Sequence, residues 1–134
     1  MKLYKATLAA LTTLALNASI VLAQDKFSTG AITWDTTNNK VWATSSGGTY
    51  DQPFVSGENA IFEGTPGTIT LGEAITANSI TFSATSSGYI IEGNTMDLTG
   101  GKITQSVGSP TNVTHTITSA IIGSPSVYVA TNTA

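Results

Sequence analysis

The chain has 134 residues, of which only 10% are charged, and it contains no cysteine and no arginine. A net charge of −3 argues against nucleic acid and anionic membranes as partners, because both require basic side chains to neutralise phosphate. The lack of cysteine excludes disulfide frameworks, thiolate catalysis and thiolate metal sites. Abundant Thr, Ser, Gly and Asn between regularly spaced aliphatic residues indicate a folded, Thr-rich β protein rather than a disordered chain.

The first 23 residues are interpreted as a secretory signal peptide. Lys2 and Lys5 form a positive n-region, an apolar run follows over 6–22, and Val21 to Ala23 offer small or aliphatic residues at the cleavage positions. A membrane-spanning helix is the alternative, but the run is short for a span of about 20 residues, and no stop-transfer charges follow it. Cleavage between Ala23 and Gln24 predicts an exported mature chain with three lysines, eight carboxylates and a net charge of −5.

Residues 24–64 are expected to form an N-terminal cap with short strands. Aromatic residues concentrate here: Phe27, Trp34, Trp42, Tyr50, Phe54 and Phe62. Strands are predicted at Ala31–Trp34 and Lys40–Ala43, and the Asn-rich turn between them suits a hairpin that brings the two indoles together. The aromatic residues either form a small core that closes one end of a β structure, or Trp34, Trp42 and Tyr50 form a platform for stacking sugars.

From residue 65 to 134, apolar residues alternate with Thr, Ser and Asn, as in strands with one buried face. The residues predicted to share inward faces are Ile69 with Leu71, Ile80 with Phe82, Met96 with Leu98, and Val113 with Ile117. The leading apolar residues recur at intervals of 10 to 13 positions: Ile69, Ile80, Ile90 and Ile103. Short strands without Asn-Gly hairpin turns favour a parallel β-helix, but the pattern leaves a β-sandwich open.

The sequence offers no set of residues suited to catalysis, cofactor binding or metal binding. Glu92 and Asp97 are the nearest acidic pair after the cap, and both are predicted to point outward as solvated carboxylates. His115, the single histidine, is expected at the edge of the apolar face in a hydrogen-bonded structural role. The glycosylation sequon Asn112-Val113-Thr114 is interpreted as a chance match. We therefore expect no catalytic residue, no cofactor and no metal, and a chain that is not an enzyme.

A series of short motifs between residues 31 and 123 resembles the start of bacterial autotransporter passengers that carry the autotransporter-associated β-strand repeat. These passengers are exported, right-handed parallel β-helices, so the resemblance implies an all-β solenoid with an N-terminal aromatic cap and β-helix coils over 65–134. The motifs that carry it are, in order, Ile32-Thr33-Trp34-Asp35, Tyr50-Asp51-Gln52, Val55-Ser56-Gly57-Glu58-Asn59-Ala60-Ile61-Phe62, Gly67-Thr68-Ile69-Thr70-Leu71-Gly72, Ile75-Thr76-Ala77-Asn78-Ser79-Ile80-Thr81-Phe82, Tyr89-Ile90-Ile91-Glu92-Gly93, Met96-Asp97-Leu98-Thr99-Gly100-Gly101-Lys102-Ile103 and Thr116-Ile117-Thr118-Ser119-Ala120-Ile121-Ile122-Gly123.

The resemblance implies a secreted or cell-surface, adhesin-like passenger segment whose partners are glycans or proteins on host or neighbouring cells. The alternative is a small secreted carbohydrate-binding β-sandwich. The chain departs from such passengers after Gly123, where their Gly-rich repeat is missing. A translocating barrel needs many segments of about ten alternating residues, so it would lie outside this chain. The sequence is accordingly read either as the truncated front of a longer gene or as a stand-alone relic.

Overall fold

The computed structural model describes residues 22–83, 88–106 and 113–129. The predicted signal peptide lies outside the described residues except for its last two positions. The described part contains ten strands and no helix. The strands are β1 (Asp25–Ser28), β2 (Ile32–Trp34), β3 (Asn59–Phe62), β4 (Thr68–Leu71), β5 (Ile75–Phe82), β6 (Ile90–Gly93), β7 (Met96–Gln105), β8 (Thr116–Ile117), β9 (Ile121–Ile122) and β10 (Ser126–Val129).

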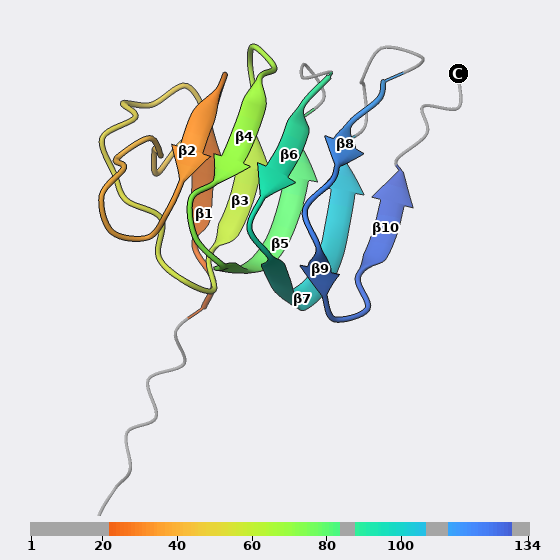
Figure 1. Ribbon diagram of the computed structural model, residues 1–134. Coiled ribbons are helices and arrows are strands. Elements are labelled where there is room, and N and C mark those ends of the chain that lie inside the picture. Colours follow the sequence, from red (N-terminus) through yellow and green to blue (C-terminus); the bar gives the residue numbers. More distant parts are fainter. Residues whose placement is uncertain (1–21, 84–87, 107–112, 130–134) are drawn as a thin grey trace, which may run out of the picture.

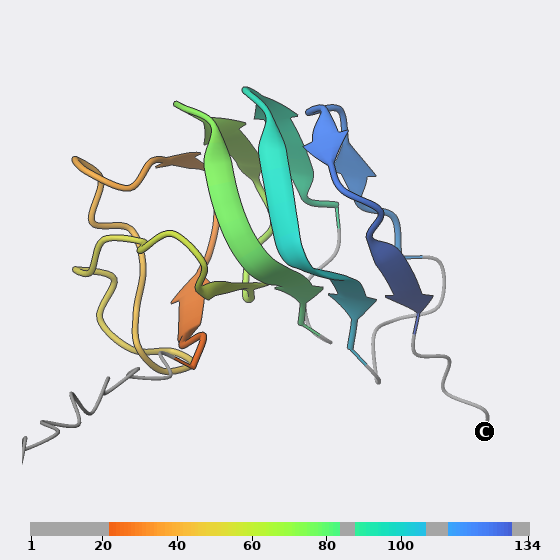
Figure 2. The same cartoon turned by 90° about the horizontal axis from the view of Figure 1, so that it is seen from below.

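The strands form two parallel sheets that face each other. One sheet has the order β1-β3-β5-β7-β10 with β9 also beside β7, and the other has the order β2-β4-β6-β8. Consecutive strands from β1 to β9 therefore alternate between the sheets, and every pair of named strands is parallel. Figures 1 and 2 show the resulting stack of coils, with the loop-rich cap at one end and β10 at the other. Parallel pairing is compatible with a β-helix or solenoid and unlike the antiparallel sheets of a β-sandwich.

Paired residues of neighbouring strands lie about twice as far apart in the sequence as the leading apolar residues do. Ile69 pairs with Ile91, 22 positions later, and Ile80 pairs with Ile103, 23 positions later. The intervals of 10 to 13 residues are half-coils, because each coil contributes one strand to each sheet. Ile69–Leu71 and Ile80–Phe82, which follow each other in the chain, therefore do not pair and belong to opposite sheets.

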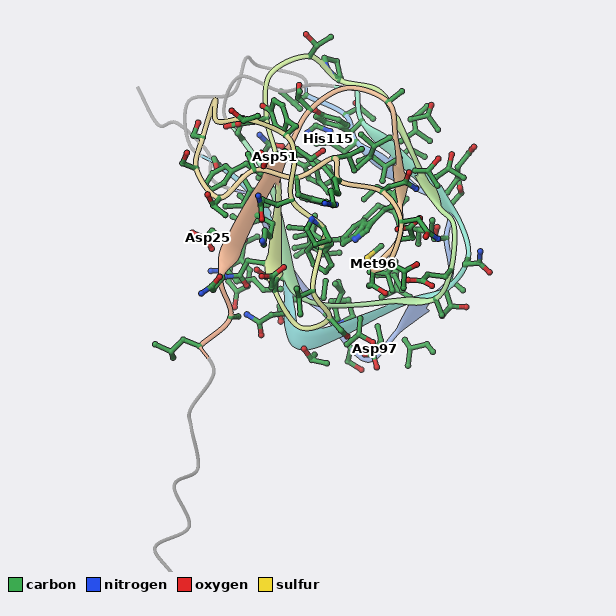
Figure 3. All side chains as sticks on the ribbon, turned by 90° about the vertical axis from the view of Figure 1, so that its left-hand side faces the viewer. Asp25, Asp51, Met96, Asp97 and His115 are labelled. Atoms are coloured by element: carbon green, nitrogen blue, oxygen red, sulfur yellow. The ribbon has the colours of Figure 1, made fainter. Side chains whose placement is uncertain are left out.

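The core consists of in-register rows of apolar side chains. One row crosses β2, β4, β6 and β8 with four isoleucines, namely Ile32, Ile69, Ile91 and Ile117. A second row crosses β3, β5 and β7 with Ala60, Ile80 and Ile103, and the exposed Val127 continues its register on β10. Figure 3 looks along the stack, with Met96 inside the ring of strands and Asp25 and Asp97 outside.

The predicted alternation of inward and outward residues is confirmed for Ile69, Leu71, Ile80, Phe82, Met96 and Leu98, all of which are buried. The exception is Ile90. Its side chain is 38% exposed, whereas Tyr89 and Ile91 are fully buried. Tyr89, Ile90 and Ile91 are all apolar. The alternation of side chains therefore allows either Ile90, or Tyr89 and Ile91, to point inward.

The cap brings the two tryptophans together without the predicted hairpin. Trp34 and Trp42 are both 0% exposed, and their ring centroids lie 5.0 Å apart. Trp34 belongs to β2, which pairs in parallel with β4. Trp42 instead forms an isolated antiparallel bridge with Gln52. The predicted strand Lys40–Ala43 forms only isolated bridges, because β2 pairs with β4 instead.

Candidate functional site

The tryptophans cannot form a sugar-stacking platform. Trp34 and Trp42 are fully buried and pack against Phe54 and Phe62 with centroid distances of 4.8 to 5.7 Å. The Tyr50 hydroxyl donates to Glu63 Oε1 at 3.2 Å. A stacking platform requires ring faces that are open to solvent. The platform interpretation is therefore wrong, because both indoles belong to the buried core.

A buried carboxylate fastens the cap loop to β3. Glu63 follows β3 directly and is only 9% exposed. Its Oε1 accepts the Gly47 N–H at 2.8 Å, and its Oε2 accepts the Ser46 hydroxyl at 2.5 Å. Burial and the Glu63 carboxylate both raise the pKa of the Tyr50 phenol above its ordinary range. The sequence analysis did not identify this role, because nothing in the residues next to Glu63 indicates the distant loop that it binds.

Lys26 and Glu58 form a buried ion pair between β1 and the residue before β3. Lys26 points inward from β1, and its Nζ lies 3.6 Å from Glu58 Oε1, with side chains 7% and 11% exposed. Glu58 Oε2 also accepts the Val55 N–H at 2.7 Å. Buried ions need partners because water no longer solvates them. The pair is structural, and the sequence analysis, which only counted the lysines, did not identify it.

His115 has the hydrogen-bonded structural role that was predicted. Its ring stacks on Phe82 with centroids 3.9 Å apart and 7° between the planes. Nδ1 accepts the Tyr89 N–H at 3.2 Å, and Nε2 lies 2.7 Å from Gln105 Oε1. This arrangement requires a neutral ring with its proton on Nε2, since Nδ1 must accept. Burial lowers the pKa of His115, which also favours the neutral ring.

The acidic pair named in the sequence analysis does not converge. Glu92 is exposed on β6 and Asp97 is half-buried on β7, and these strands belong to different sheets. Among the described residues, no group of three or more His, Cys, Asp or Glu side chains could hold a metal ion. In the predicted sequon, Asn112 lies outside the described residues.

The outer surface of the β2-β4-β6-β8 sheet carries an exposed polar array. Thr33, Thr70 and Glu92 form one row in register, and Thr116 and Thr118 extend the array at the β8 end. All five side chains are exposed, and neighbouring strands in a sheet lie about 4.8 Å apart. We call these five residues the hydroxyl face. It offers regularly spaced hydrogen-bonding groups with one carboxylate, which suits contact with a polar surface.

A cavity of about 330 Å³ opens at the end of the stack opposite the cap. Apolar side chains dominate its lining, and the ring of His115 forms part of the wall. The residues that surround it include Phe82, Ile103, His115, Ile117, Val127 and Tyr128.

Comparison with known proteins yields one named relative. The chain is similar to the protein called Adhesin BmaC autotransporter from Brucella suis biovar 1 (strain 1330), with 38% identity over 99 residues that cover 70% of this chain. The chain spans only 3% of the length of that relative. No family model matches the chain, and no solved structure matches it. Within the described residues, no helix is long and apolar enough to cross a membrane.

Proposed function

We propose that the chain is an exported, non-enzymatic, adhesin-like segment of an autotransporter-type passenger, displayed on a bacterial surface or secreted. The proposal is supported by the similarity to an autotransporter adhesin over 70% of the chain. It is also supported by the predicted signal peptide, with cleavage between Ala23 and Gln24. The absence of converging acids among the described residues agrees with a binding role.

The proposed architecture is a right-handed parallel β-helix that serves as a rigid rod. The observation that carries it is the alternation of strands between two parallel sheets, with in-register rows such as Ile32, Ile69, Ile91 and Ile117. Each coil covers the apolar row of the preceding coil, so the stack buries a continuous core. A rod of this kind holds its outward side chains at fixed spacing.

The hydroxyl face is the proposed contact surface, with glycans or proteins of host or neighbouring cells as partners. A single hydrogen bond contributes only about 0.5 to 1.5 kcal/mol net, because water competes for both groups. Adhesion through such a face therefore depends on many weak contacts made together. Display of many copies on one surface strengthens these contacts through effective concentration.

A bead-adhesion assay tests this function. Beads coated with the exported chain, collected after signal cleavage, are applied to cultured epithelial cells. The triple variant Thr33→Val, Thr70→Val and Thr116→Val keeps the β-branched shape and removes three exposed hydroxyls from the face. We expect bead retention to fall several-fold, because these hydroxyls make the contacts.

The matched control carries three Thr→Val changes on the outer surface of the other sheet, at Thr76, Thr81 and Thr104. These outward side chains are half-buried, and we expect the control beads to bind like the wild type. Equal retention of all three bead types, or loss in the control alone, would contradict the proposed contact surface.

A further inference from the structure

We propose that Ile90 and Glu92, which both point outward from β6, form a binding site for an arginine side chain of a protein partner. The inference deepens the proposed function, because it rests on the hydroxyl face as the contact surface. It selects a basic protein segment as the partner and not a glycan.

Glu92 is an exposed carboxylate that the fold leaves free. Six of the eight acidic side chains in the sequence accept hydrogen bonds within the fold, namely Asp25, Asp35, Asp51, Glu58, Glu63 and Glu73. Glu92 and Asp97 make no hydrogen bond or ion pair with the described residues. Glu92 is exposed, whereas Asp97 is half-buried. Both oxygens of Glu92 are therefore open to a ligand.

Ile90 places an exposed apolar side chain beside this carboxylate. It is 38% exposed, whereas Ile91 between it and Glu92 is fully buried. Residues two positions apart share one face of a strand and lie about 6.6 Å apart along it. The strand β6 is paired on both sides, with β4 and β8, so this surface belongs to the middle of the sheet (Figure 1).

An apolar side chain next to a carboxylate matches the two parts of an arginine. The aliphatic stem of arginine packs along apolar surface while its charged head stays in contact with water or a polar partner. The stem can therefore lie on Ile90 while the guanidinium reaches Glu92. A guanidinium carries five N–H donors and binds a carboxylate through two parallel hydrogen bonds.

Threonine hydroxyls beside Glu92 can accept the donors that remain. Thr70 is in register with Glu92 on the neighbouring strand β4, and its side chain is exposed. Neighbouring strands lie about 4.8 Å apart, which brings this hydroxyl within reach of a guanidinium held on Glu92. A lysine ammonium has three donors and no planar fork, so the site favours arginine over lysine.

The charge of the chain selects the class of partner. After leader removal, three lysines stand against eight carboxylates. An acidic surface repels sialylated or sulfated glycans, which are anionic, and it attracts a basic protein segment. A single exposed ion pair is weak, so retention depends on many copies that bind together.

The experiment compares bead retention on two defined surfaces. One is coated with a peptide in which arginine alternates with glycine, and the other with the same peptide carrying citrulline, the neutral isostere of arginine. Beads carry the chain after leader removal as wild type, Glu92→Gln or Asp97→Asn. The two variants lose the same charge, so Asp97→Asn is the matched control. Circular dichroism verifies that each variant is folded.

We expect wild-type and Asp97→Asn beads to be retained several-fold better on the arginine surface than on the citrulline surface. Glu92→Gln should lose most of this difference. Ile90→Thr, which leaves the net charge unchanged, should also reduce retention on arginine, because the stem loses its apolar contact. Equal losses for Glu92→Gln and Asp97→Asn would locate the effect in net charge and would overturn the inference.

The same beads on cultured epithelial cells separate this inference from the proposed function. We expect acetyl-arginine amide, but not acetyl-citrulline amide, to displace wild-type beads from the cells. If the triple threonine variant is lost while Glu92→Gln is retained like the wild type, the hydroxyl face stands and the arginine site is wrong. If enzymatic removal of cell-surface glycans abolishes retention and acetyl-arginine amide has no effect, the partner is a glycan and the inference is overturned. Retention on the arginine surface that depends on Glu92, without retention on cells, would support the site and contradict the adhesin-like function.

Discussion

At the scale of single residues, buried polar side chains have specific partners that replace water. Glu63 accepts three hydrogen bonds from the cap loop, and the Tyr89 hydroxyl donates to the Glu63 carbonyl at 2.7 Å. The exceptions include the indole N–H groups of Trp34 and Trp42, which are buried without a partner among the described residues. An unsatisfied buried donor costs about 1 to 3 kcal/mol. Packing of the large indole rings offsets this cost.

His115 predicts a pH dependence of stability. The folded state lowers the pKa of His115 because burial disfavours the charged ring. The neutral His115 ring therefore contributes fully to the free energy of unfolding above the unfolded-state pKa of about 6.5. This contribution is lost as pH falls through the folded-state pKa. We expect the melting temperature to be constant above neutrality and to fall on mild acidification. Thermal melts followed by circular dichroism at a series of pH values measure this.

The control is His115→Gln, which has no group that titrates in this range. Its melting temperature should be lower than that of the wild type at neutral pH but should not fall between about pH 6.5 and pH 5, above the ordinary carboxyl range. An equal acid-induced decrease in both proteins would assign the effect to other groups.

At the scale of elements, the pairing of the two longest strands, β5 and β7, is interrupted by a β-bulge. β7 is ten residues long against eight in β5, and the register shifts between Ala77 and Ser79. Gly100 lies opposite this shift, and a Cβ there would come 2.2 Å from the Asn78 carbonyl oxygen. Glycine is therefore required for the bulge that keeps both halves of β7 paired.

Glu63→Ala tests how the cap loop is held. The change removes the acceptor for the Gly47 N–H, the Ser46 hydroxyl and the Tyr50 hydroxyl. We expect the free energy of unfolding to fall by about 1 to 3 kcal/mol, with earlier proteolytic cleavage in the loop over 44–51. Urea denaturation and limited proteolysis measure the two effects.

Glu92→Ala is the matched control because Glu92 is an exposed carboxylate on β6. A change at such a site stays within about 0.5 kcal/mol. If the two variants lose the same stability, the loop is not held by Glu63.

At the scale of the whole molecule, a series of ring contacts connects the tryptophans of the cap with His115, just before β8. Successive centroids lie 5.0 Å apart for Trp42 and Trp34, 5.7 Å for Trp34 and Phe62, 5.8 Å for Phe62 and Phe82, and 3.9 Å for Phe82 and His115. Trp34, Trp42, Phe62 and Phe82 belong to one buried cluster, so the cap packs against the same core that the coils share. Damage at the cap should therefore lower the stability of all coils together.

Replacing Trp34 or Trp42 with alanine tests this coupling. Each indole is fully buried, and the loss of a buried tryptophan costs about 3 to 5 kcal/mol. We expect a single cooperative urea transition at a lower midpoint when the β-sheet signal is followed by circular dichroism. Val55→Ala in the exposed part of the cap should leave the midpoint nearly unchanged. A normal midpoint for both tryptophan variants would contradict their role in the core.

Much of the local pattern could be predicted from the sequence, but little of the pairing. The inward positions of Ile69, Leu71, Ile80 and Phe82 follow from a period of two along a strand, which neighbouring residues determine. The sequence also allowed us to predict that the tryptophans form a core and that His115 has a structural role. The roles of Glu63 and of the Lys26–Glu58 pair were not, since a carboxylate after a strand has the same local pattern whether it faces water or a loop.

The sequence by itself determined that this is an all-β chain with one buried face per strand and an aromatic end, because alternation and composition are local properties. Only the tertiary structure decided that strands one full coil apart are neighbours, that Ile91 and not Ile90 points inward, and that Glu63 holds the loop beside the tryptophans. These features depend on contacts between residues about 22 positions apart. Such contacts stabilise the fold only once the chain between them has folded and brought the two strands together.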